Sequence, residues 1–176
     1  MVERCRLGDQ RALMEIYDRY YKAMYNTAFR ITGHSAEAED IMQEAFLSAF
    51  TKIDSFKETS TFGAWLKRIV VNESITAYNK IAKQGEVSYN DELKNEADND
   101  GIVLDDGDKN NEKVHLILKK IKSLKENYRL GLTLHLIEGY DYEEICEIMN
   151  ISYANCRTMI SRAKESLRKK LEDHEK

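Results

Sequence analysis

Near the C-terminus, polar and charged side chains follow one face of a predicted helix. The stretch from Glu138 to Leu171 reads EGYDYEEICEIMNISYANCRTMISRAKESLRKKL, and its apolar pattern predicts two short helices joined by a few residues. The inward stripe of the second helix leaves hydroxyl, amide and guanidinium groups outside, and such groups suit base edges and phosphates in a major groove. The outward side chains are Tyr153, Asn155, Arg157, Thr158, Ser161, Arg162 and Lys164. The alternative is an ordinary helical hairpin with a solvated charged face.

A second stretch, FKETSTFGAWLKRIVVNES, interleaves aromatic and basic residues between Phe56 and Ser74. Trp65 stands there among two phenylalanines, two lysines and an arginine. This combination is typical of surfaces that stack unpaired bases and neutralise the backbone. However, Phe62, Trp65, Leu66 and Ile69 also follow the spacing of a buried helical stripe. Packing in a core is therefore the alternative for most of these side chains.

A third stretch, SAEAEDIMQEAFLSAF, places Asp40, Gln43 and Glu44 at i, i+3 and i+4. These positions share one helical face, opposite an apolar stripe. The face is suited to docking a basic partner surface, or it is simply solvated.

The sequence lacks the patterns of catalysis, metal binding and membrane insertion. It has no glycine-rich phosphate loop and no plausible nucleophile–histidine pair, so we expect neither an enzyme nor a cofactor. Cys5, Cys146 and Cys156 are widely spaced and predict reduced thiols rather than metal ligands. No apolar run approaches the ~20 residues of a membrane span, and no signal-peptide core is present. We therefore expect a cytoplasmic protein.

The helical patterns predict an all-α protein with two small domains. Residues 1–83 predict a three- to four-helix bundle, and residues 113–176 predict a four-helix domain that ends in a helix-turn-helix. Residues 84–112 are rich in Asp, Asn and Gly and predict a flexible linker. The formal charges of the three parts are +1, −8 and +3, in chain order. The overall charge of −4 therefore conceals two mildly basic blocks around an acidic one.

Together the three stretches resemble bacterial RNA polymerase sigma factors of the extracytoplasmic-function (ECF) group. The matching motifs are AEDIMQEAFLSAF, STFGAWLKRIVVNESI and the C-terminal hairpin, in the order and spacing of that family. The resemblance implies a subunit that binds core RNA polymerase and directs it to promoter DNA. It also implies that the first domain docks on the polymerase and opens the −10 element, while the second reads the −35 element.

The resemblance assigns roles to individual positions. It makes Asp40, Gln43 and Glu44 candidates for docking on the polymerase clamp. Candidates for −10 recognition and melting are Phe56, Lys57, Ser60, Thr61, Phe62, Trp65, Lys67, Arg68 and Asn72, of which we expect Trp65 to be the most buried. Candidates for −35 contact are Ser152, Tyr153, Asn155, Arg157, Thr158, Arg162 and Lys164. An anti-sigma factor is a further candidate partner, because such factors often hold members of this family.

Two positions depart from the family pattern. Leu124-Lys125 stands where a Leu-Pro pair is common, and Met159 stands where the reading helix often carries a basic residue. Met159 predicts the loss of one phosphate or base contact. The alternatives to a sigma factor are a stand-alone helix-turn-helix regulator and a helical adaptor without a nucleic-acid role. Neither needs the stretch between Phe56 and Ser74.

Overall fold

The computed structural model describes residues 1–84 and 110–172, with side chains for all of these except 81–84, 110 and 111. The chain divides into two compact units, Met1–Val103 and Leu104–Lys176. Every regular element in the described residues is helical, which confirms the predicted all-α fold class. The predicted linker, including its apolar cluster at Ile102–Leu104, lies outside the described residues except at its two ends.

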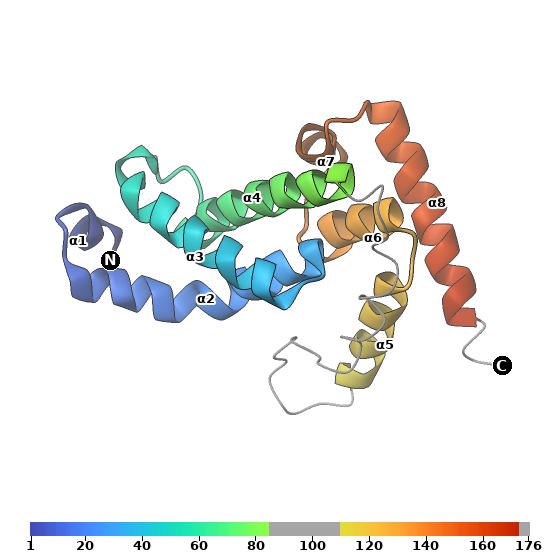
Figure 1. Cartoon of the computed structure of the whole chain (residues 1–176), viewed down its shortest axis with the longest axis horizontal. Helices are drawn as coiled ribbons and strands as arrows, with labels where there is room; N and C mark the ends of the chain where they lie inside the picture. The colour runs from blue at the N-terminus through green and yellow to red at the C-terminus, as the bar shows by residue number, and fades with distance from the viewer. Residues whose placement is uncertain (85–109, 173–176) are drawn as a thin grey trace. The chain divides into compact units, whose positions relative to one another are not determined.

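Three long helices form the body of the first unit (Figure 1). They are α2 (Gln10–Thr32), α3 (Ser35–Thr51) and α4 (Phe62–Gln84). A short helix, α1 (Val2–Arg6), precedes them and contacts α2 and the 3-10 turn η1 (Ile53–Ser55). Each pair of long helices is in contact, so the three enclose one core. Side chains such as Ile16, Leu66 and Val70 are fully buried there, and each such burial stabilises the fold by about 1.5–3 kcal/mol.

Side-chain caps start two of the four α-helices in the first unit, α2 and α4. Asp9 Oδ1 accepts hydrogen bonds from the amides of Arg11 and Ala12 at the start of α2, at 2.9 and 3.3 Å. Gly33 ends that helix in the left-handed conformation (φ 81°), at the position where the apolar spacing and the glycine predict the helix to stop. Thr61 Oγ1 accepts from the amide of Ala64 and starts α4. The sequence makes Ser35 a plausible N-cap of the next helix, but this prediction is wrong, because α3 already begins at Ser35 and His34 precedes it without a side-chain cap.

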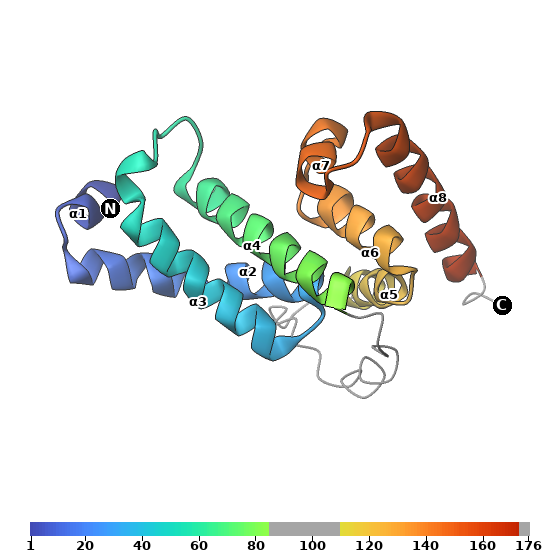
Figure 2. The same ribbon diagram turned by 45° about the horizontal axis from the view of Figure 1, so that its top comes forward.

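The second unit contains four α-helices and one π-helical turn within its described residues (Figure 2). The long C-terminal helix α8 (Tyr153–Glu172) contacts each of the other three. These are α5 (Asn110–Lys122), α6 (Glu126–Leu132) and α7 (Tyr142–Met149). Its core contains Ile121, Leu124, Leu132, Ala163 and Leu167. The turn η3 (Thr133–Ile137) continues α6, and the amide of Glu138 donates to the carbonyl of Thr133 in the i→i−5 pattern.

In the sequence, Asp141 with Glu144 and then Ser152 stand at positions that predict helix caps, and α7 and α8 start directly after Asp141 and Ser152. Asp141 and Glu144 form a reciprocal capping box, with bonds of 2.8 and 3.1 Å between side chains and backbone amides. Ser152 Oγ accepts from the amide of Asn155 at 3.3 Å and starts α8. By contrast, the sequence predicts Asn127 as the N-cap of the helix that follows it, and this prediction is wrong, because α6 already begins at Glu126 after Lys125.

Candidate nucleic-acid and partner interfaces

The outward face of α8 is a row of polar side chains on a helix whose other face is fixed in the core. Cys156, Ile160 and Ala163 are fully buried, and their spacing turns the remaining positions away from the core. Of the seven predicted −35 contacts, Lys164 is half-buried. The other six are exposed, namely Ser152, Tyr153, Asn155, Arg157, Thr158 and Arg162. The structure thus brings six of the seven together on the N-terminal two-thirds of α8, with Ser152 directly before the helix, in the arrangement that a major-groove helix requires.

The beginning of α8 is held by an aromatic contact chain. The ring of Tyr153 lies 6.2 Å from that of Tyr142 in α7, and Tyr142 lies 5.0 Å from His135 in η3. His135 Nδ1 is 3.1 Å from the carbonyl oxygen of Tyr140, which can only accept, so Nδ1 carries the proton. Tyr153 is still 49% exposed. It can therefore offer one ring edge to a ligand while its other side is positioned by Tyr142.

Met159 does not lie in the outward row. Its side chain is half-buried over α6, and a Cβ placed on Gly131 would meet Met159 Cε at 2.8 Å and Ile160 Cδ1 at 3.0 Å. Gly131 therefore permits a close approach of α6 and α8 that Met159 fills. Met159 therefore has a packing role. The absence of the basic residue that the family often carries at this position did not indicate that role.

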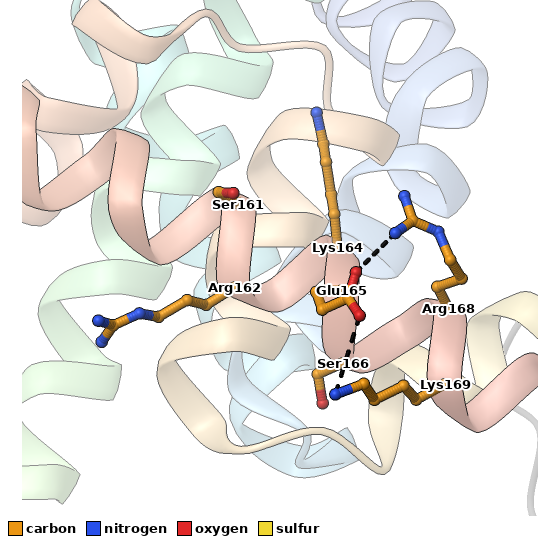
Figure 3. Close-up of a pocket in the computed structure, with 7 residues that line it drawn as sticks. All are labelled: Ser161, Arg162, Lys164, Glu165, Ser166, Arg168 and Lys169. Carbon is orange, nitrogen blue, oxygen red and sulfur yellow. Dashed lines mark hydrogen bonds and ion pairs between the residues drawn. The ribbon is translucent and has the colours of Figure 1, made fainter.

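The C-terminal half of α8 carries an ion-pair cluster over a shallow hollow (Figure 3). Arg168 Nη1 lies 2.6 Å from Glu165 Oε2, and Lys169 Nζ lies 3.8 Å from Glu165 Oε1. Arg162 extends away from this cluster. Glu165 therefore neutralises two cations that the sequence alone suggests are available for phosphates.

The aromatic-basic stretch separates into a buried aromatic layer and an exposed polar layer. Phe56 and Phe62 are only 5% and 8% exposed and pack edge to face at 5.6 Å between ring centroids. Trp65 contacts both rings and is half-buried, so the expectation that Trp65 is the most buried of this set is wrong. The physical reason is that the segment before α4 folds back over the bundle and inserts Phe56 beneath the tryptophan.

The polar candidates of this stretch remain accessible. Five are exposed, namely Lys57, Ser60, Thr61, Arg68 and Asn72, while Lys67 is half-buried. Phe56, Ser60 and Phe62 also line a shallow hollow together with Met1, Val2, Glu3 and Glu58. One end of the first unit therefore combines exposed hydroxyls and cations with aromatic edges at the bottom of a depression.

The face of α3 with Asp40, Gln43 and Glu44 is exposed throughout. Leu47 continues the same face one turn later and is 68% exposed, which sequence reasoning did not single out. An exposed leucine beside acids at helical spacing was the available signal. Such a face combines an apolar anchor with charges and is typical of a protein-binding surface.

Glu73 of α4 lies close enough to this face to interact with Glu44. Its Oε2 is buried and lacks a hydrogen-bond partner among the described residues. Burial raises the pKa of Glu73, the charge of Glu44 raises it further, and Lys52 opposes the shift. The acidic face therefore extends from α3 to α4.

The cysteines are free thiols. Burial and the neighbouring Cys146 raise the pKa of the Cys156 thiol to about 11, which disfavours the reactive thiolate. Among the described residues, no group of three or more His, Cys, Asp or Glu side chains could hold a metal ion. No described helix is long and apolar enough to cross a bilayer.

Comparisons with known proteins agree with this geometry. Residues 16–84 match the family model of Sigma-70 region 2, and residues 115–167 match that of Sigma-70, region 4. The ECF RNA polymerase sigma factor SigW of Bacillus subtilis is 35% identical over 178 residues, covering 98% of this chain and 95% of SigW. The chain belongs to the ECF sigma factors.

Further relatives of this sigma factor share its full extent. The ECF RNA polymerase sigma-E factor of Escherichia coli K12 is 33% identical, with 98% of this chain and 93% of that protein covered. Two solved structures share the fold. They are the sigma factor RpoE from Bartonella quintana with the anti-sigma factor NepR (TM-score 0.57, 23% identity, 90% and 96% coverage), and CnrH with the cytosolic domain of CnrY (TM-score 0.56, 19% identity, 98% and 95% coverage). As a member of this family, the protein directs RNA polymerase to promoters.

Proposed function

We propose that this sigma factor reads promoters at two points, with a separate surface for polymerase. In this proposal residues 1–83 dock on the polymerase and open the −10 element, residues 113–176 read the −35 element, and residues 84–112 connect them. The observation that carries it is the row of polar side chains on α8, fixed outward by a buried stripe. The protein acts without catalysis of its own, in the cytoplasm, where polymerase and DNA are located.

Docking falls to the exposed face of α3. Asp40, Gln43, Glu44 and Leu47 lie there at the spacing of one helical stripe, and a basic surface of the polymerase complements the three polar residues. Leu47 supplies the apolar centre that an interface of this kind needs.

Reading of the −10 element falls to the exposed layer of the aromatic-basic stretch. Lys57, Arg68 and Lys67 lie near the phosphate backbone, while Ser60, Thr61 and Asn72 can hydrogen-bond to unpaired bases. Trp65 is the aromatic side chain that retains surface for stacking, and Phe56 and Phe62 support it from below.

Reading of the −35 element falls to Ser152, Tyr153, Asn155, Arg157, Thr158, Arg162 and Lys164. The net charge of +3 on residues 113–176 gives little counterion release, so free binding to duplex DNA is weak. Polymerase raises the effective concentration of each reader for its element when it holds both at the correct spacing. An anti-sigma factor is a candidate partner, since the solved sigma factor RpoE from Bartonella quintana is in complex with the anti-sigma factor NepR.

Run-off transcription with core polymerase on genomic fragments tests this function. We expect discrete start sites that require the protein, with shared elements near −10 and −35. In a gel-shift assay, the holoenzyme should bind these promoters specifically, while the isolated chain should not bind them at physiological salt. Tight, specific binding by the isolated chain would instead support a stand-alone regulator.

A further inference from the structure

The short helix α1 lies against the segment that the proposed function assigns to promoter opening. This helix, Val2–Arg6, precedes residue 16, where the match to region 2 begins. Arg6 in its last turn extends to the segment between η1 and α4. Its Nη2 donates to the carbonyl oxygen of Phe56 at 2.6 Å, and its Nη1 lies 3.2 Å from Glu58 Oε1. The guanidinium of Arg6 therefore links α1 to both Phe56 and Glu58, in the segment between η1 and α4.

The segment has a conformation that needs support. Glu58 adopts φ 57°, in the left-handed region that non-glycine residues rarely occupy. Such a residue persists when its surroundings hold it there. Residues 57–61 are all exposed, so packing contributes little to their placement. The contacts of Arg6 with Phe56 and Glu58 lie on both sides of Lys57 and are suited to this task.

The side chain of Arg6 is held in position by its surroundings. It is only 23% exposed, and its guanidinium also pairs with Glu3 of the same helix. Cys5, the preceding residue, is buried in the core of the bundle. Arg4 pairs with Asp9 at 2.8 Å, and Asp9 caps α2. Burial of Cys5 therefore anchors α1 to the bundle, the exposed pair of Arg4 adds little to this anchoring, and Arg6 contacts the promoter-opening segment.

We propose that Arg6 is a positioning residue that holds Phe56–Thr61 in the conformation that reads the −10 element. The inference rests on the proposed −10 role of this segment. It assigns a function in promoter opening to a helix that lies outside the matched region 2. A planar guanidinium presents a fixed fork of donors, here to the carbonyl of Phe56 and the carboxylate of Glu58, and the ammonium of lysine lacks that fork geometry.

The experiment compares Arg6→Ala and Arg6→Lys with Arg4→Ala as the matched control. Arg4 lies on the same helix and carries the same charge, but its ion pairs are with Asp9 and Glu15. Each variant is assembled with core polymerase and titrated with a fluorescein-labelled single strand carrying the non-template −10 sequence found by run-off transcription. A scrambled strand is the second control. The affinity for core polymerase is measured in parallel, and trypsin cleavage after Lys57 is followed by mass spectrometry in the free chain.

We expect both Arg6 variants to lose about tenfold in affinity for the −10 strand, as the loss of a charge-assisted hydrogen bond predicts. Cleavage after Lys57 should accelerate in both, while Arg4→Ala and the affinity for core polymerase should match the wild type. Full activity of Arg6→Lys would overturn the inference, because charge alone would then suffice. An equal loss of polymerase affinity would also overturn it, since the role would be general stability. If the wild-type holoenzyme ignores the −10 strand, the proposed function fails and the inference with it, whereas unchanged binding by Arg6→Ala refutes the inference alone.

Discussion

Glu73 shows how a single half-buried acid can make stability depend on pH. Its unpartnered Oε2 and the charge of Glu44 disfavour the carboxylate in the folded state, so its folded-state pKa lies above the ordinary value. The folded state therefore binds the proton more tightly than the unfolded chain does. The cost of carrying Glu73 is present in full above the folded pKa, and it disappears below the unfolded pKa of about 4.3.

We predict that Glu73→Gln raises the free energy of unfolding at pH 7. The neutral amide removes the desolvation cost of the charge while it preserves the shape of the side chain. The gain should shrink as the pH falls and vanish below about pH 4. Urea unfolding followed by circular dichroism across this range measures it, with Glu39→Gln as a control on the exposed face of α3. A gain that is independent of pH would mean that burial of the charge is not its cause.

The aromatic residues mark how far the sequence can predict the site. Helical spacing correctly predicted Phe62 and Leu66 as buried, because both lie on the inward stripe of α4. Phe56 lies in a non-helical segment, where no periodicity exists to predict its side. Its burial depends on the path of the chain around the bundle, and that path is a tertiary property. For the same reason, the support of that path by Arg6 could not be inferred.

Met159 illustrates a second limit at the same scale. In the sequence, Met159 is an apolar residue among the polar residues of the reading helix. The sequence does not show which residue of another helix Met159 contacts. The neighbour is Gly131, which lies far away in the chain and lacks a side chain. A glycine within a helix normally lowers stability by about 1 kcal/mol relative to alanine. Here the absence of Cβ makes room for Met159 and Ile160.

At the scale of elements, the start of a helix was predictable where a side chain caps it, and it was not predictable where no side chain does. Asp141 with Glu144, and Ser152, cap the helices that their positions predicted, and of the two candidates Ser60 and Thr61 it is Thr61 that caps α4. The starts of α3 and α6 lack a side-chain cap, so polar residues near them misplaced the boundary by one or two positions. α1 spans only five residues and is too short to show a helical period. The π-helical turn after α6 likewise has no local signature in the sequence.

The ion pairs of α8 lead to a prediction at this scale. Glu165 holds Arg168 and Lys169, which otherwise would extend the basic surface of the helix (Figure 3). We predict that Glu165→Gln raises the affinity of the holoenzyme for a duplex −35 fragment several-fold at low salt. The slope of log K against log salt should steepen by roughly 0.9 for each released cation that meets a phosphate. Stability should hardly change, because exposed pairs of this kind contribute little.

Glu172→Gln is the matched control for this prediction. It makes the same change in charge on the same helix, at an exposed position beyond the ion-pair cluster. An equal gain in both variants would show that net charge alone is responsible. No gain in Glu165→Gln would show that the C-terminal half of α8 does not approach the DNA backbone.

For the whole molecule, the distribution of charge matters more than its sum. Two blocks of +1 and +3 contain the proposed readers, and the residues between them carry −8. A chain with this distribution gains little from long-range attraction to DNA, and its acidic part repels DNA. This pattern predicts that promoter binding by the chain depends on polymerase, and the sequence is sufficient to make that prediction. The division into two helical units was equally predictable, because the apolar periodicity stops near residue 84 and resumes near residue 113.

The acidic stretch itself leads to the last prediction. We infer that it acts as a nucleic-acid mimic in the polymerase, attracted to basic walls until growing RNA displaces it. The joint substitution of Asp105, Asp106 and Asp108 by Asn should then weaken binding to core polymerase and reduce abortive transcripts relative to full-length product. Both effects should diminish as salt screens the attraction. Replacement of the same three residues by Glu keeps the charge and should behave as wild type. If the Asn variant leaves polymerase affinity and promoter escape unchanged, the acidic charge has no such role, and the segment serves only to set the distance between the two readers.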